Sequence, residues 1–334
     1  MFIFDCECHM MPLADDINYF PFYKMNQWAL RNMRNLFPLV LHGLRENVTA
    51  ADLKEFANDQ KRRVGYAPGE SGDALIEKMD TAGVQMACVL PESFLPMSMG
   101  VRMMSTNGWL AAEIKKYPER LIGVCNVGPI AGRGIKNALW ELEYLVKEMN
   151  FKAVKLYPVD DLPINDERLW PYYEKVRELG IPLFVHTGFS YCVPGRSSNC
   201  FPWLLEDVCE NFPEIPILAY HMGYPFTDAL NMCAMKYRNL FIGTSLLPLF
   251  GHGISRRAQI LLGEAIACAG IDKIIWGTDS GATNTATEWL EKFQINESVQ
   301  KEYGYKPLSN EDRAKWAGLN LAKMMKITPP EAAK

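Results

Sequence analysis

Short, almost wholly apolar runs alternate along the chain with longer segments in which apolar residues recur every three or four positions. Eight such runs occur, at residues 2–8, 86–90, 121–127, 153–157, 183–186, 217–221, 240–244 and 273–278. Runs of this length and composition are typical of parallel strands that are buried on both faces. We therefore predict eight buried strands.

The segments between these runs have the spacing of amphipathic helices. We expect helices over residues 73–82, 105–116, 135–149, 166–179, 201–211, 227–236 and 254–269. Gly83, Gly180 and Gly270 each directly follow a predicted helix, where glycine commonly ends one. Eight strand–helix repeats without a change of composition predict an α/β fold, a (β/α)₈ TIM barrel in which residues 1–334 form one domain.

Two segments do not fit the repeat. Residues 10–70 form a long, aromatic-rich insertion after the first strand. On a barrel this insertion leaves from the face that carries the active site, so it is interpreted either as a lid or as an oligomer contact. Residues 312–325 are expected to form a helix that covers the outside of the barrel.

The charge balance excludes some classes of partner. The 334 residues include 35 Lys and Arg against 39 Asp and Glu, a formal net charge of -4, and no long basic run occurs. Nucleic acid is therefore a poor candidate partner. The N-terminal segment lacks the basic region of a signal peptide and the length of a membrane span, so we expect a cytoplasmic protein with no membrane partner.

The nine cysteines are an odd number, and several fall within apolar runs, so disulfides are not implied. Cys6 and Cys8 form a Cys-x-Cys pair on the first predicted strand. If Glu7 and His9 face the barrel interior, strand alternation places both cysteines on the outer face, and simple packing is the expectation for them.

Candidate metal ligands gather at the ends of predicted strands. Glu7 and His9 end the first strand, His186 the fifth, His221 the sixth, and Asp279 follows the eighth. In a barrel these ends meet at one mouth. Imidazole nitrogens with carboxylate oxygens suit zinc or a similar divalent metal with one open position for water or substrate. The remaining histidines, His42 and His252, are expected to be packing or surface residues.

Taken in order, these elements resemble the amidohydrolase superfamily, within it the amidohydrolase 2 group of aminocarboxymuconate-semialdehyde and γ-resorcylate decarboxylases and predicted metal-dependent hydrolases. The resemblance spans almost the whole chain, through residues 7–9, 79–84, 117–123, 155–158, 185–188, 219–223, 277–279 and 319–324. It implies one divalent metal ion, zinc or else manganese, held by Glu7, His9, His186 and Asp279. It also implies that His221 polarises water or substrate and that Asp279 transfers a proton.

The resemblance leaves two roles for Lys155. Binuclear members bridge two metals with a carbamylated lysine at this place, whereas mononuclear members can direct its ammonium at a substrate carboxylate. Because Glu7 replaces a usual histidine, the mononuclear interpretation is favoured. Tyr157 and Arg196 are further candidates for substrate binding, since a guanidinium suits a carboxylate.

The reaction is predicted first as hydrolysis of a small, carboxylated cyclic substrate, a lactone or amide, by metal-activated water. The alternative is non-oxidative decarboxylation of a hydroxylated aromatic or unsaturated carboxylic acid. Glu7-x-His9 resembles hydroxybenzoate-type decarboxylases, since most amidohydrolases carry His-x-His there. Those decarboxylases often have Glu three positions after the sixth-strand histidine, where this chain has Tyr224. Relatives are often dimers, so a homodimer is expected.

Overall fold

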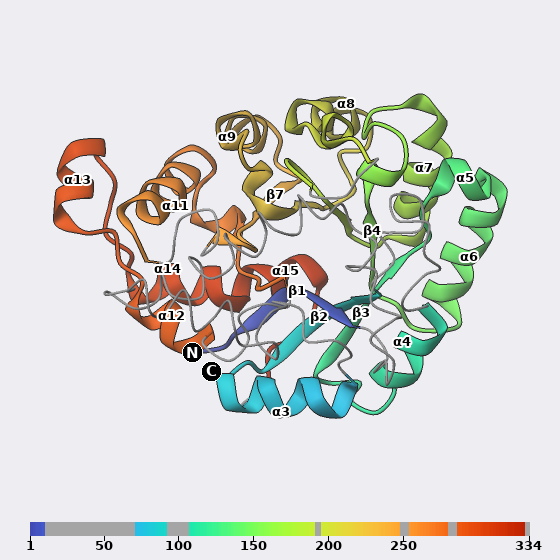
Figure 1. Cartoon of the computed structure of the whole chain (residues 1–334), viewed down its shortest axis with the longest axis horizontal. Helices are drawn as coiled ribbons and strands as arrows, with labels where there is room; N and C mark the ends of the chain where they lie inside the picture. Colours follow the sequence, from blue (N-terminus) through green and yellow to red (C-terminus); the bar gives the residue numbers. More distant parts are fainter. Residues whose placement is uncertain (11–70, 92–106, 191–194, 248–253, 280–285, 331–334) are drawn as a thin grey trace, which may run out of the picture.

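The computed structural model describes residues 1–10, 71–91, 107–190, 195–247, 254–279 and 286–330. Eight parallel strands follow one another around the molecule in sequence order, so the predicted eight-stranded barrel is confirmed (Figure 1). They are β1 (Phe4–Met10), β2 (Met86–Pro91), β3 (Leu121–Asn126), β4 (Ala153–Leu156), β5 (Leu183–Val185), β6 (Ile217–Ala219), β7 (Leu240–Gly243) and β8 (Ile274–Ile275). The predicted insertion beyond Met10, with His42, lies outside the described residues, as does His252.

Helices surround these strands in Figure 1. The seven predicted segments correspond to α3 (Gly72–Ala82), α4 (Asn107–Ile114), α6 (Ile135–Lys147), α7 (Trp170–Leu179), α8 (Leu205–Asn211), α9 (Thr227–Lys236) and α11 (Arg256–Ala269). Gly83 and Gly180 adopt left-handed φ values of 70° and 65°, as their predicted place after a helix requires. The helices α5 (Ile130–Arg133), α12 (Ala286–Lys292) and α13 (Glu297–Tyr303) were not predicted.

Apolar side chains pack in two layers. One layer fills the barrel and includes Phe4, Cys88, Phe184 and Tyr220. The second lies between the strands and the helices and includes Val89, Val154, Val185 and Leu142. Alternate residues of each strand thus contribute to different layers, which is why the strands read as continuous apolar runs.

A β-bulge interrupts this alternation in β1. Asp5 pairs with Ala87 and Cys8 pairs with Val89, so β1 holds one more residue than β2 over this stretch. Cys6 therefore packs with the interior cluster, whereas Cys8 packs with the outer one. The prediction that both cysteines face outward was wrong for Cys6, because alternation does not continue through a bulge. Both cysteines are buried, and neither forms a disulfide.

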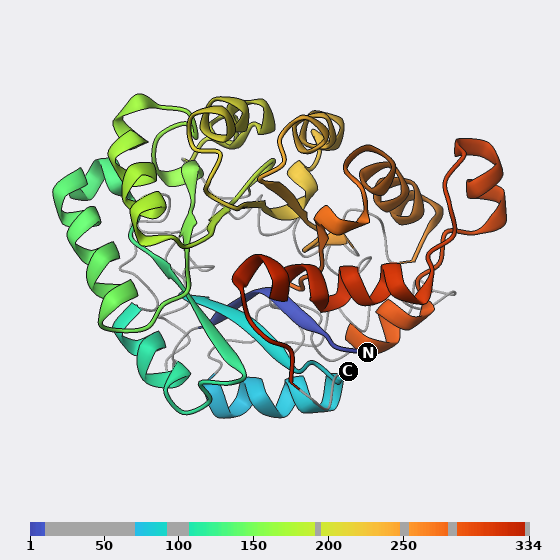
Figure 2. The same cartoon turned by 180° about the vertical axis from the view of Figure 1, so that it is seen from behind.

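The C-terminal helical segment covers the end of the barrel at which the strands begin. It comprises α14 (Asn310–Ala314), a π-helical turn and α15 (Asn320–Met325), and Figure 2 shows it crossing the strands. Leu321 and Met325 pack with the interior cluster beside Phe2 and Phe4. This differs from the expected position on the outer side, because the segment's apolar residues cover the open N-terminal ends of the strands.

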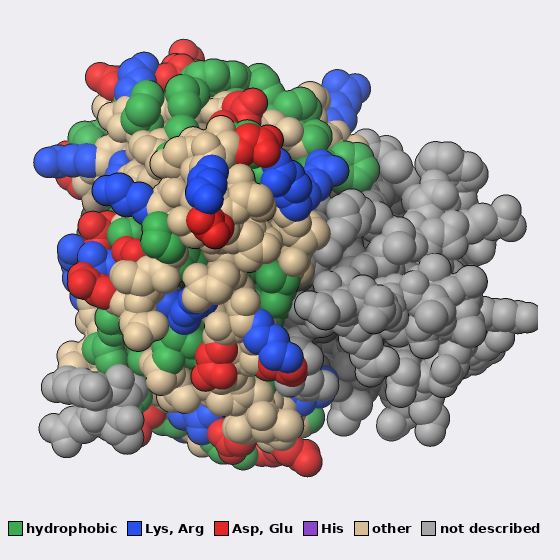
Figure 3. All heavy atoms as spheres, turned by 90° about the vertical axis from the view of Figure 1, so that its left-hand side faces the viewer, with side chains coloured by type: hydrophobic (Ala, Val, Ile, Leu, Met, Phe, Trp, Pro, Cys, Tyr) green, Lys and Arg blue, Asp and Glu red, His purple; other side chains and the backbone are tan. Residues whose placement is uncertain are grey.

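Acidic and basic side chains alternate over the described part of the face shown in Figure 3. Many of them form exposed ion pairs, among them Lys147 with Glu143 and Lys236 with Glu206. Within the described residues, no helix is both long and apolar enough to span a membrane.

The first and last strands meet without a ladder of paired residues in the described part of the chain. The Cys6 N–H donates to the Trp276 carbonyl at 3.1 Å, and further contacts involve the side chain of Asp5. Gly277 makes this close approach possible, since a Cβ there would lie 2.5 Å from Cys6 Sγ and 3.2 Å from Asp5 Oδ1. We call this meeting of β1 and residues 276–279 the β1–β8 seam.

Gly277→Ala is expected to lower the free energy of unfolding by about 2 kcal/mol, because the added methyl group forces the β1–β8 seam apart. Urea denaturation measures the effect. Gly132→Ala in α5 is the matched control, since its Cβ would meet only Pro129, at 3.5 Å and beyond. Equal denaturation midpoints for the two variants would contradict this account of the seam.

Candidate metal centre

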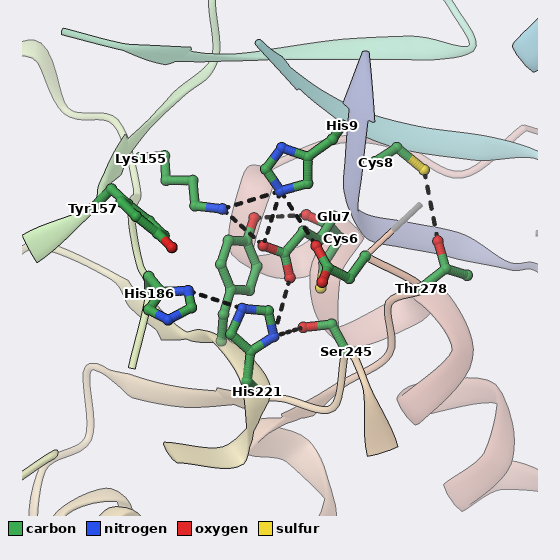
Figure 4. A network of polar contacts seen from close by, with 12 residues as sticks. Cys6, Glu7, Cys8, His9, Lys155, Tyr157, His186, His221, Ser245 and Thr278 are labelled. Atoms are coloured by element: carbon green, nitrogen blue, oxygen red, sulfur yellow. Dashed lines mark hydrogen bonds and ion pairs between the residues drawn. The ribbon is translucent and has the colours of Figure 1, made fainter. Parts of the chain in front are cut away.

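Six polar side chains converge at the carboxyl ends of the strands (Figure 4). They come from β1, from β4, and from the segments that follow β5, β6 and β8, and each is at most 7% exposed. The six are Glu7, His9, Lys155, His186, His221 and Asp279. The structure therefore brings together the ligands and catalytic residues that the sequence predicted, along with Lys155.

Glu7, His9 and Asp279 form the tightest group. One ligand atom from each lies within 4.8 Å of the others. His9 Nε2 is 3.3 Å from Asp279 Oδ1 and 3.6 Å from Glu7 Oε1. The bulge in β1 contributes to this geometry, because it is the place where the strand admits Glu7 as an additional residue close to His9.

Glu7 is fully buried, and its charge is matched by Lys155. Lys155 Nζ donates to Glu7 Oε1 at 2.9 Å and lies 3.3 Å from His9 Nε2. Burial alone would raise the pKa of Glu7, but the positive charges of Lys155 and His221 and the hydrogen bond from His9 hold that pKa well below its usual range. Glu7 is therefore an ionised ligand candidate at neutral pH.

His186 and His221 form a hydrogen-bonded chain beside this group. His186 Nδ1 and His221 Nε2 are 3.0 Å apart, Ser245 Oγ is 3.1 Å from His221 Nδ1, and His186 Nε2 is 3.3 Å from the Phe189 carbonyl. A carbonyl only accepts, so His186 Nε2 carries a proton. Burial and the nearby charges of His221 and Lys155 lower the pKa of His186, so its Nδ1 accepts from His221.

This chain bears on the predicted fourth ligand. In the described arrangement both ring nitrogens of His186 are engaged in hydrogen bonds, and His186 does not belong to the compact group of Glu7, His9 and Asp279. A role for His186 as a ligand requires that the contact with Phe189 be replaced. That role stays a prediction.

Two of the site residues hold unusual backbone conformations. His221 has a φ of 61° and Asp279 a φ of 54°, in the left-handed region that favours glycine. Such conformations cost about 1–3 kcal/mol each and are concentrated at functional sites. At both strand ends the turn directs a polar side chain into the mouth, which supports a functional interpretation of these residues.

Tyr157 and Arg196 occupy different surroundings. The Tyr157 hydroxyl is 2.8 Å from Ser190 Oγ, and its ring meets His186 edge-on at 4.6 Å between centroids. Tyr157 thus lines the mouth beside the histidine chain. Arg196 is exposed, and its backbone N–H donates to the Val159 carbonyl. Substrate binding by either residue stays a prediction.

Sequence reasoning missed Asp5 and Ser245. Asp5 is fully buried and accepts hydrogen bonds from the backbone N–H groups of Glu7 and Thr278, both at 3.0 Å. Burial raises the pKa of Asp5 to about 6, although these hydrogen bonds oppose the shift. The position of Asp5, two residues before Glu7, could have indicated its role in the sequence. For Ser245 the sequence offered only its position after a predicted strand.

With this geometry established, comparison with known proteins identifies the family. A family model described as amidohydrolase matches residues 4–327. The chain belongs to the amidohydrolase family. This family is metal-dependent, so the chain is a metal-dependent enzyme of hydrolase or lyase type.

Individual relatives of this amidohydrolase are distant. The γ-resorcylate decarboxylase of Polaromonas sp. is 24% identical over 249 residues, which cover 60% of this chain and 72% of the relative. A solved TIM-barrel protein from Bordetella bronchiseptica has a TM-score of 0.66 at 17% identity, covering 98% of this chain and 99% of that one. The 2,6-dihydroxybenzoate decarboxylase from Rhizobium has a TM-score of 0.60 at 16% identity, with the same coverage. Both structures support the fold.

The described residues fit a divalent ion. Glu7 Oε2 is buried and receives no hydrogen bond within the described residues. Two carboxylates and one imidazole face one another within 4.8 Å, and this mixed oxygen and nitrogen set suits zinc or manganese. The identity of the metal is not fixed by these donors.

Proposed function

We propose that this amidohydrolase decarboxylates a small hydroxylated aromatic or unsaturated carboxylic acid. Glu7 carries the proposal, because a carboxylate stands where most amidohydrolases have the first histidine of strand 1, and it lies in the group with His9 and Asp279. The match to a γ-resorcylate decarboxylase over 72% of that protein's length supports the same reaction.

One divalent ion, zinc or manganese, would be held by Glu7, His9 and Asp279, with His186 as the fourth predicted ligand. When bound, such an ion supplies positive charge that fixes anionic oxygen atoms in place. Two metals with a carbamylated Lys155 are less well supported, because the Lys155 ammonium already pairs with Glu7.

The charges of the site favour an anionic substrate. Glu7 and Asp279 bring two carboxylates together, and the ammonium of Lys155 and the imidazole of His221 lie beside them. A divalent ion would make the site positive. A substrate carboxylate is therefore attracted to the mouth, where Lys155 and Tyr157 lie side by side with 5.7 Å between Nζ and the ring centre.

Asp279 is the proposed proton carrier. Its carboxylate first takes the proton of the substrate's hydroxyl group and then gives that proton to the substrate carbon that bears the carboxylate. The bond between that carbon and the carboxylate then breaks, its electron pair returns to the carbon skeleton, and carbon dioxide leaves. His221 would orient the substrate's polar groups only if its contact with His186 or Ser245 were replaced when substrate binds.

Hydrolysis, the reaction that the sequence favoured first, is the second candidate. Tyr224 supports it, because the decarboxylases often carry Glu there to pair with the preceding histidine. Here the Tyr224 hydroxyl accepts a hydrogen bond from Arg257 at 2.6 Å instead. In this reaction Asp279 would pass the proton to the leaving group. A homodimer and a cytoplasmic location stay predictions.

Wild-type protein is expected to bind about one divalent ion per chain, since its described ligand atoms form one compact group. His9→Ala should lose most of this metal, because it removes the imidazole of the group. Elemental analysis after dialysis measures both, and His186→Ala in parallel tests the fourth ligand. Asp73→Asn, which alters an exposed carboxylate, is the control. Full metal content in His9→Ala would contradict the proposed site.

The metal-loaded protein is expected to release carbon dioxide from at least one acid in a panel of hydroxybenzoates. Mass spectrometry of the product distinguishes the two candidates, because decarboxylation removes carbon dioxide, whereas hydrolysis of a lactone adds water. Asp279→Asn should lower turnover by about a hundredfold or more, since it removes the proton carrier. Near-normal turnover in a metal-loaded Asp279→Asn protein would refute that role.

Lys155→Met is expected to keep about one metal ion and to raise KM for the carboxylated substrate about tenfold, because the ammonium beside the mouth is lost. The metal-free variant should also melt at a lower temperature, since Glu7 loses its buried partner. Titration with metal, steady-state kinetics and thermal melts measure these effects. Lys152→Met, at an exposed position, is the control. Loss of metal in Lys155→Met would favour the carbamylated bridge.

A further inference from the structure

Asp5 lies in the β1–β8 seam, two residues before the proposed ligand Glu7. Its Oδ1 accepts from the backbone N–H groups of Glu7 and Thr278, each at 3.0 Å. Its Oδ2 accepts from Thr278 Oγ1 at 2.5 Å and from Cys8 Sγ at 3.2 Å. Asp5 is 0% exposed. The side chain thus receives donors from β1 and from the segment that follows β8.

These contacts replace a strand ladder. Each of the other seven neighbouring pairs of strands is joined by paired residues, whereas the described parts of β8 and β1 are joined by isolated contacts. The Cys6 N–H to Trp276 carbonyl bond is one of them, and the Thr278 bonds to Asp5 are the others described above. The separation of the two strand ends therefore depends on Asp5.

The residues that Asp5 contacts are a proposed ligand and the neighbour of another. Glu7 is itself in the group, and Thr278 directly precedes Asp279. The Asp5 carboxylate accepts a hydrogen bond from the Glu7 backbone on one side and from both donors of Thr278 on the other. It thereby fixes the distance between Glu7 and Asp279. Groups that orient metal ligands in this way commonly change metal affinity 10- to 100-fold when they are removed.

Asp5 is not an additional ligand. Its two oxygens offer about four acceptor positions, and four donors from Glu7, Cys8 and Thr278 already use them. The carboxylate is thus committed to the protein. We infer that Asp5 and Thr278 are positioning residues that tie the closure of the barrel to the placement of Glu7 and Asp279, an inference that rests on the proposed metal site.

Thr278→Val tests this inference, because it removes the hydroxyl donor with little change of shape. Thr278→Ser is the matched variant, since it keeps the hydroxyl. Isothermal titration of the full chain with Zn²⁺ should show affinity lowered about 10- to 100-fold in Thr278→Val and changed by less than about threefold in Thr278→Ser. The visible absorption of the Co²⁺-loaded protein, which reports ligand geometry, should shift in Thr278→Val alone.

The outcomes separate the two proposals. Equal Zn²⁺ affinity and equal Co²⁺ spectra for Thr278→Val and Thr278→Ser, with wild-type binding intact, would overturn the positioning role and leave the metal site standing. Absence of Zn²⁺ binding by the wild type would overturn both. If Thr278→Val does not fold, Asp5→Asn decides, because its amide nitrogen cannot accept from Thr278; wild-type affinity in that variant would overturn the inference.

Discussion

The site depends on keeping a fully buried carboxylate ionised. Glu7 has no access to water, and an isolated charge there would be costly. Lys155, at 2.9 Å, supplies the opposite charge from β4, so strands on separate parts of the barrel cooperate in stabilising one negative group. Because Glu7 Oε2 still receives no hydrogen bond within the described residues, part of that negative charge remains to attract a cation. The ion pair and the metal proposal thus follow from the same constraint.

The proposed metal ligands lie where the barrel closes. The ligands Glu7 and Asp279 lie on opposite sides of the β1–β8 seam, the one junction at which the described strands lack a ladder. A bulge in β1, the absent side chain of Gly277 and the carboxylate of Asp5 all act at that junction. A metal bound by these ligands would therefore cross the junction as well, so metal binding and fold stability are expected to be linked.

Much of the barrel could be predicted from the chain because its strands are buried on both faces and its helices are amphipathic. The strand-end positions of Glu7, His9, His186, His221 and Asp279 followed from the same pattern. The direction of Cys6 did not follow, since a bulge has no signature in apolar alternation. The partners of His186 could not be predicted either, because Ser245 and the Phe189 carbonyl reach the histidine chain only through the turns after β5 and β7. The C-terminal helix was predicted, but the surface it covers depends on packing with Phe2 and Phe4.

The support given to His221 bears on which residue carries the proton. Its Nδ1 faces Ser245 at 3.1 Å, and Glu7, 3.7 Å away, already pairs with Lys155. A hydroxyl orients an imidazole but does not offset the charge of an imidazolium, whereas a carboxylate at position 224 would. Tyr224 instead bonds to Arg257. None of these contacts gives His221 a carboxylate that is available to stabilise a proton on its ring. Asp279, on the strained turn after β8, is therefore the residue better placed to take up and give a proton in either candidate reaction.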